Sequence, residues 1–247
     1  MVNKLLMFNE EPKQFGPQHL IYIFVAFALS LFLWIYLGKK IKSKESQDKI
    51  IKITGVLLLM MLFLNRLFLV VYLKRPFFPQ SWCSAIALFF GLSTLVFKRN
   101  NPIFHYLAPI GFLSGLLPTL LPDYLNEGYL ICGCTSILFP TTIFALLYHS
   151  TLLFISVLIY VFKFIKPDIK KWYYFIFGYG FCMIYGLIYM NLMDPDFVDV
   201  LGKSLNFMNI NKPIFAFFDA KWIGALGFAA YLIYLYIFEF IKKKKQL

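Results

Sequence analysis

The chain has 247 residues, of which 60% are hydrophobic and only 15% are charged, and its mean hydropathy is +0.72. Soluble globular domains average about 45–50% apolar and about 25% charged residues, and the apolar excess here lies in long uninterrupted blocks such as Ile21–Leu37. This composition excludes a cytosolic enzyme, a nucleic-acid-binding domain and a disulfide-stapled secreted module. The formal net charge of +12 is therefore evidence about orientation in a membrane.

Apolar blocks long enough to cross a bilayer follow one another along the chain. Because a hydrocarbon core of about 30 Å needs roughly 20 apolar residues of helix, we predict an all-α fold, a polytopic membrane helix bundle with about seven transmembrane helices. Six is the alternative, because Pro76 and Pro79 blur the start of the third block. The predicted spans are His19–Gly38, Ile51–Leu73, Gln80–Phe97, Ile103–Leu121, Thr141–Phe162, Trp172–Leu192 and Trp222–Ile241.

The basic residues predict how these spans are oriented. With the N-terminus outside, sixteen Lys and Arg residues fall on inside segments and seven on outside segments, while Arg66 lies within the second span. Inside segments of membrane proteins carry the excess of basic residues, so we predict N-out and C-in. The chain is then one integral membrane domain, residues 1–247, with an outside tail at 1–18 and a basic inside tail at 242–247.

Targeting signals are sparse. Residues 1–18 hold no apolar segment followed by a small-residue cleavage site, so we expect the first span to be retained. Lys far outnumbers Arg, and Phe, Ile and Asn are frequent, a bias that favours an AT-rich bacterial genome and a multi-pass protein of the bacterial plasma membrane.

Ionisable and nucleophilic residues within a membrane are candidates for function, because they are costly unless they face the protein interior. His149 lies eight residues below the start of the fifth span, Cys83 lies near the start of the third, and His19 opens the first, so all three belong to the outer half. His105 begins the fourth span at the inner surface and is read as an interfacial histidine.

His149 shares its helix face with other polar residues. Thr142, His149 and Ser156 are spaced by seven and therefore stack on one side of a helix, which predicts that this side faces other helices or a cavity. Such a stripe serves either as interhelical hydrogen-bond glue or as part of a catalytic site. Cys83 likewise is either a packing residue or a nucleophile whose proton a nearby imidazole accepts.

Asn65 and Arg66 lie in the outer half of the second span. The planar fork of Arg66 suits a phosphate or a carboxylate, so an anionic lipid headgroup is one expected partner and Asp194 is the structural alternative. The chain contains no P-loop, G-x-G-x-x-G, H-E-x-x-H or G-x-S-x-G motif. Cys132 and Cys134 form a C-x-C pair with no nearby His, so we predict neither metal nor cofactor.

Four short motifs resemble the YwaF-like bacterial integral membrane proteins, which are similar to the vertebrate transmembrane protein 164 acyltransferases of ether-phospholipid metabolism. These are Phe15–Leu20, Pro79–Cys83, Gly115–Asp123 and the histidine at 149, so that the resemblance covers about residues 15–149. It implies that Cys83 and His149 form an acyl-transfer pair. Pro79-Gln80-Ser81-Trp82 stands here where the family has a Pro-Leu-His-Leu-type run, so the family's histidine beside the nucleophile is absent.

The leading hypothesis is an outward-facing lipid acyltransferase. Cys83 and His149 would be catalytic, while Asn65 and Arg66 would hold the headgroup and His19 would orient the lipid or share the proton. The partners would be a membrane phospholipid and a lyso-lipid or lipidated acceptor, with no nucleic acid, and the oligomeric state is left open. The alternatives are a lipid-ester hydrolase of the same fold and a non-catalytic small-molecule carrier or membrane partner protein.

Overall fold

The computed structural model describes residues 16–73, 77–79, 82–120, 140–192 and 220–244. This part of the chain contains helices and no strand, which confirms the all-α prediction. The elements are α2 (Pro17–Lys40), α3 (Lys44–Leu73), α4 (Trp82–Val96), α5 (Ile103–Leu120), α6 (Pro140–Val161), the 3₁₀-helix η2 (Ile169–Lys171), α7 (Tyr173–Leu192) and α9 (Ala220–Lys244).

Within the described residues, four helices are long and apolar enough to cross a membrane. They are α2, Lys44–Val71 of α3, α5, and Thr142–Val161 of α6; Cys83–Val96 and Gly227–Ile241 form shorter apolar helices. These helices suit a membrane protein, as their composition predicts. The number that cross the bilayer, and their orientation, stay predictions.

Helix ends extend the predicted blocks into polar sequence. α3 begins at Lys44, seven residues before the predicted span at Ile51, because Ser43 is a good N-cap residue and Glu45 lies in the first turn, where a carboxylate interacts favourably with the helix dipole. At the end of α2, Lys39 and Lys40 occupy the last turn, where cations are favoured. Apolar blocks therefore locate helix centres better than helix ends.

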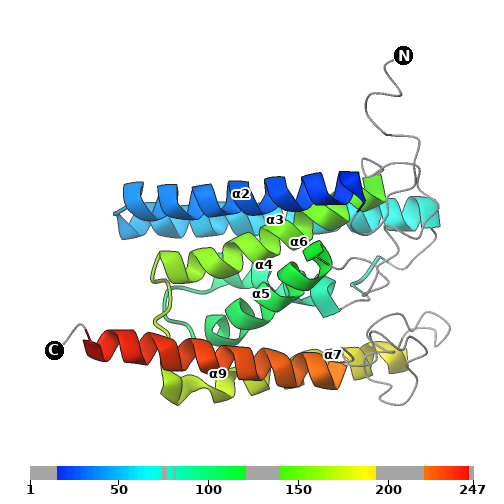
Figure 1. Ribbon diagram of the computed structural model, residues 1–247. Coiled ribbons are helices and arrows are strands. Elements are labelled where there is room, and N and C mark those ends of the chain that lie inside the picture. Colours follow the sequence, from blue (N-terminus) through cyan, green and yellow to red (C-terminus); the bar gives the residue numbers. More distant parts are fainter. Residues whose placement is uncertain (1–15, 74–76, 80–81, 121–139, 193–219, 245–247) are drawn as a thin grey trace.

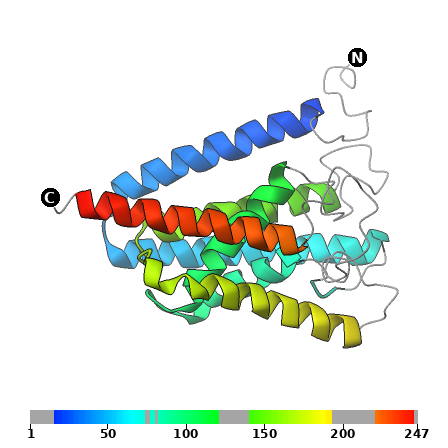
Figure 2. The same cartoon turned by 60° about the horizontal axis from the view of Figure 1, so that its bottom comes forward.

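The helices run up and down the long axis of the bundle in alternating directions (Figure 1). α6 lies at the centre and packs extensively on α3 and α5, while α4 packs on α3 and α5, and α7 packs on α5. Figure 2 shows α2 inclined to α3 and α9, while Tyr22 and Trp34 of α2 donate to the Leu146 and Phe154 carbonyls of α6. The outward face of α2 is strongly exposed and apolar, with Ile21 at 65% and Phe24 at 74%, as expected of a helix that contacts lipid.

Two glycine contacts allow the central helices to approach closely. A Cβ on Gly115 of α5 would lie 2.5 Å from the Leu153 backbone nitrogen and 2.7 Å from the His149 carbonyl oxygen on α6. A Cβ on Gly91 of α4 would lie 2.5 Å from the Leu59 side chain on α3. The first contact matters for the site, because it sets the separation of α5 from the backbone of His149.

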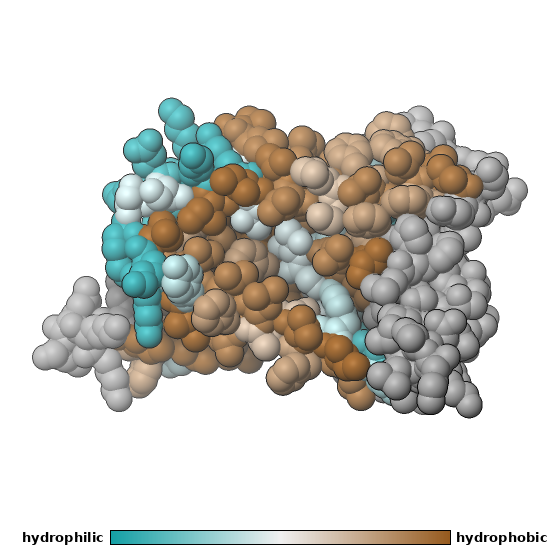
Figure 3. All heavy atoms as spheres, turned by 90° about the horizontal axis from the view of Figure 1, so that it is seen from above, coloured by the Kyte–Doolittle hydropathy of each residue, from teal (hydrophilic) through white to brown (hydrophobic). Residues whose placement is uncertain are grey.

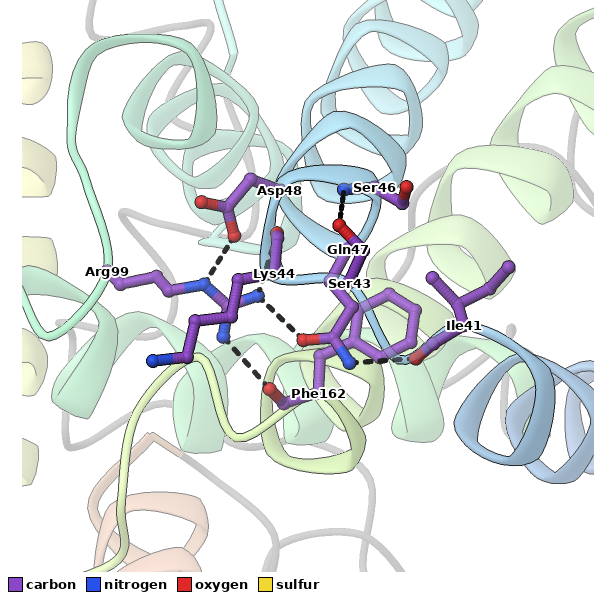
Figure 4. Close-up of polar contacts among 8 residues, drawn as sticks. All are labelled: Ile41, Ser43, Lys44, Ser46, Gln47, Asp48, Arg99 and Phe162. Carbon is purple, nitrogen blue, oxygen red and sulfur yellow. Dashed lines mark hydrogen bonds and ion pairs between the residues drawn. The ribbon is translucent and has the colours of Figure 1, made fainter.

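One end of the bundle is hydrophilic and the adjoining surface is an apolar belt, as the space-filling view shows (Figure 3). The hydrophilic end gathers the last turn of α2, the first turn of α3 and the ends of α4 and α6, which carry or adjoin the basic residues assigned to the inside. Arg99 joins these segments: its guanidinium pairs with Asp48, donates to the Gln47 side chain at 2.8 Å, and donates to the Phe162 carbonyl at 3.0 Å (Figure 4). These Arg99 contacts hold α3 and the end of α6 together at the hydrophilic end.

Candidate functional site

His149 lies on the buried face of α6 and is 0% exposed. Its Nδ1 is 2.8 Å from the carbonyl oxygen of Ala145, one turn earlier. Because a carbonyl oxygen only accepts, Nδ1 carries the proton in the neutral ring, and Nε2 carries the lone pair. His149 therefore presents Nε2 as the basic nitrogen, the form that a general base requires.

The predicted polar stripe on α6 is buried throughout. Thr142, His149 and Ser156 are each 0% exposed, which confirms that this side of the helix faces the protein interior. The Ser156 hydroxyl donates to the Leu152 carbonyl at 2.7 Å. Only His149 in this stripe brings a titratable group into the core.

Cys83 is the second residue of α4 and is 4% exposed. It carries a thiol rather than a disulfide. Ser84, the next residue along, is 0% exposed. The start of α4 therefore buries a thiol and a hydroxyl side by side in the sequence.

Arg66 connects this region to His149. It is 4% exposed, and its Nη2 donates to the Ser84 Oγ at 2.9 Å, which links α3 to α4 beside Cys83. Phe68, two residues further along α3, stacks on Phe144 of α6 with 5.6 Å between the ring centroids, so Arg66 lies in the same part of the α3–α6 contact as His149. The buried Arg66 side chain thus joins α3 to Ser84 of α4, and α3 in turn packs on α6, which carries His149. Asn65, the preceding residue, is also buried, at 1% exposed.

His19 takes part in a second buried contact, between α2 and α5. It is 1% exposed, and its Nε2 donates to the Thr119 carbonyl at 2.9 Å. The Tyr22 hydroxyl, one turn further along α2, donates to the Leu146 carbonyl at 2.7 Å and bonds with the Ser150 hydroxyl. These contacts hold the first two turns of α2 against the same part of α5 and α6.

Several residues of this region were missed by reasoning from sequence. The sequence analysis assigns no role to Ser84, Tyr22 or Ser150, and Thr119 enters it only within the Gly115–Asp123 motif. The signal for Tyr22 was its spacing of three from His19, which places both on one helix face. Nothing in the sequence indicates that Ser84 bonds with Arg66, because spacing along two helices leaves their relative rotation open.

The remaining candidates lie elsewhere. His105 is on the first turn of α5, ten residues before Gly115, which corresponds to about 15 Å along the helix from the level of His149. Its Nε2 is 3.5 Å from the Lys171 Nζ and its ring stacks on Tyr174. This position confirms the predicted separation of His105 from His149.

Cys132, Cys134 and Asp194 lie outside the described residues, and the side chain of Cys182 on α7 is not described. Within the described ranges, no group of three or more His, Cys, Asp and Glu side chains is arranged to hold a metal ion. The site therefore offers a thiol, an imidazole, a guanidinium, an amide and a hydroxyl as its functional groups.

Comparisons with protein-family models, with curated proteins and with solved structures found no match for this chain.

Proposed function

We propose that this protein is a membrane-embedded lipid acyltransferase that moves a fatty-acyl group from a phospholipid through Cys83 and His149. The observation that carries the proposal is the position of Arg66, which bonds with Ser84 beside Cys83 and lies on α3, the helix that packs against the His149 helix α6. A buried thiol and a buried basic imidazole provide the groups that acyl transfer needs. The resemblance to YwaF-like proteins leads to the same pair.

In the first half of the proposed reaction, His149 Nε2 accepts the Cys83 thiol proton as the sulfur attacks the ester carbonyl carbon of the donor lipid. The carbon–sulfur bond forms and the acyl carbon–oxygen bond breaks. The protonated imidazole then donates its proton to the departing lyso-lipid oxygen. The acyl group is left on sulfur as a thioester, and His149 is neutral again.

In the second half, the hydroxyl or amine of an acceptor attacks the thioester while His149 takes its proton. The new ester or amide forms, the carbon–sulfur bond breaks, and the imidazole returns the proton to the Cys83 sulfur. Arg66 and Asn65 hold the anionic headgroup in this scheme, since a guanidinium fork suits a phosphate. His19 orients the lipid from α2.

The proposed setting is the outer leaflet of a bacterial plasma membrane. Hydrophilic residues gather at the end of the bundle remote from Cys83, where the Lys and Arg residues predicted to face the inside lie. An outward-facing site favours a phospholipid donor, because acyl-CoA is confined to the cytoplasm. The acceptor is then a lyso-lipid or another lipidated molecule of the same leaflet.

The test is the lipid composition of cells that express the wild type, Cys83→Ala, His149→Ala or His105→Ala at equal membrane levels. His105→Ala is the matched control, because His105 is also a buried histidine but lies at the opposite end. Relative to cells without the protein, we expect the wild type and His105→Ala to change the acyl profile. Cys83→Ala and His149→Ala should leave the acyl profile unchanged. Equal profiles for all four would overturn the proposal, and free fatty acid in place of acylated acceptor would indicate hydrolysis.

A further inference from the structure

A cavity of about 280 Å³ lies between α5, α6 and α9, separate from the residues assigned to catalysis. Its walls are almost wholly apolar and include Pro109, Leu113, Val157 and Tyr231. Ligand pockets for small molecules begin at about 300 Å³, so this cavity, which we call the α5–α9 pocket, has room for part of a lipid and not for a headgroup with both chains.

The α5–α9 pocket opens at the apolar surface. Phe112 and Tyr234, which line it, are 38% and 37% exposed, and Ala230 is exposed at its edge. The neighbouring outward residues of α9, Ile233 and Ile237, are exposed and apolar as well. A cavity with so few polar groups does not hold water well, and in a membrane its mouth adjoins hydrocarbon.

The depth of the pocket relates it to the proposed site. Ser156 lines the pocket and lies seven residues beyond His149 on α6, which corresponds to about 10 Å towards the hydrophilic end. A phospholipid with its ester at the level of His149 extends its chains in this direction, towards the middle of the bilayer. The pocket therefore lies where the chain of such a lipid passes.

We propose that the α5–α9 pocket binds one hydrocarbon chain of a membrane phospholipid. This inference rests on the proposed function in one respect, that the bound lipid is a substrate of the Cys83 site. Binding itself requires no catalysis, so it is measured with the Cys83→Ala protein. A methylene gains transfer free energy only when it leaves water, so a chain that moves from the bilayer into the pocket is held by the fit of its shape.

The experiment uses the full chain in vesicles of phosphatidylethanolamine and phosphatidylglycerol that contain phosphatidylethanolamine with a photoactivatable diazirine in one acyl chain. Irradiation and peptide mass spectrometry then locate the labelled residues. Ala230→Phe fills the pocket from α9, and Ala229→Phe adds the same ring to the adjacent exposed residue, which does not line the pocket. Val157→Phe fills it from α6, and thermal unfolding establishes that each variant is folded.

We expect label on the pocket residues in the wild type, Cys83→Ala and Ala229→Phe proteins, and a several-fold loss of this label in a folded Ala230→Phe or Val157→Phe protein. Label spread evenly over the exposed faces of α2 and α9 would overturn the proposal. Equal labelling of the pocket in the filled variants and in Ala229→Phe would also overturn it. Label from a diazirine fatty acid but none from the phospholipid would assign the pocket to free fatty acid instead.

If the pocket is labelled in the Cys83→Ala protein while cellular acyl profiles do not depend on Cys83, then chain binding stands and the proposed acyl transfer fails. If acyl profiles depend on Cys83 but the pocket is never labelled, then the proposed acyl transfer stands and chain binding fails. The two proposals therefore fail separately.

Discussion

The contact of Gly115 with α6 predicts a specific response to adding one methyl group. In Gly115→Ala, the new Cβ would meet the Leu153 nitrogen at 2.5 Å, the His149 carbonyl oxygen at 2.7 Å and the Leu153 Cα at 2.8 Å. All three are backbone atoms, so no side-chain rotation relieves the contact. Helices α5 and α6 must move apart, and His149 moves with its backbone.

The magnitude follows from two opposing effects. Overpacking of a well-packed core costs about 1–3 kcal/mol, whereas replacing glycine by alanine within a helix gains about 1 kcal/mol. Because the clash involves only backbone, we expect the upper part of the range and a net loss of about 2 kcal/mol in the free energy of unfolding. Gly180→Ala is the matched control, since a Cβ there meets nothing within 4 Å.

The assay is reversible unfolding in mixed detergent micelles, followed by acyl transfer on the folded variants. Gly115→Ala should unfold more readily than the wild type, and Gly180→Ala should be equally or more stable. A displacement near 1 Å at a reacting group costs about 100-fold in rate, so Gly115→Ala should also lose activity beyond its loss of stability. A Gly115→Ala protein as stable as Gly180→Ala would refute the reasoning on close approach.

Three further predictions concern the Ser84–Arg66 bond, the contacts of Arg99 and the orientation of the chain in the membrane. Ser84→Ala removes the acceptor of a buried guanidinium bond and should lower the free energy of unfolding by about 1–3 kcal/mol, as measured by denaturation in detergent, and no change would mean that the bond to Arg66 is unimportant. Arg99→Lys keeps the charge but loses the fork that contacts Asp48, Gln47 and Phe162 together, so it should destabilise by about 1 kcal/mol, whereas a protein unfolding at the wild-type midpoint would contradict this expectation. In a protein without other cysteines, Lys163→Cys should react with a membrane-impermeant maleimide only after cells are opened, and labelling of intact cells would reverse the predicted orientation.

The helical fold was predictable because its signal is local. A bilayer-length apolar block such as Ile51–Leu73 indicates a helix without knowledge of its neighbours. The helix ends were less predictable than the helices themselves, because the polar turn before Ile51 continues the same helix from Lys44. Helix capping depends on single residues, and hydropathy averaged over a block does not detect them.

For the candidate site, the burial of the α6 face was predictable from sequence, and the contacts between helices were not. Spacing placed Cys83 and His149 in the same half of the bundle, and the seven-residue spacing on α6 correctly predicted a buried face. The bond from Arg66 to Ser84 depends on the relative rotation of α3 and α4, two helices that approach closely where Gly91 of α4 meets Leu59 of α3. Such packing involves residues far apart in the sequence, and no pattern within one helix indicates it.

The central claim is that Cys83 carries the acyl group. The direct measurement is intact-protein mass spectrometry after the purified protein is incubated in phospholipid vesicles with a lyso-lipid acceptor. We predict a mass increase of one acyl chain, removed by hydroxylamine as a thioester is, in the wild type and none in Cys83→Ala. Acyl transfer at the wild-type rate by Cys83→Ala would contradict the account.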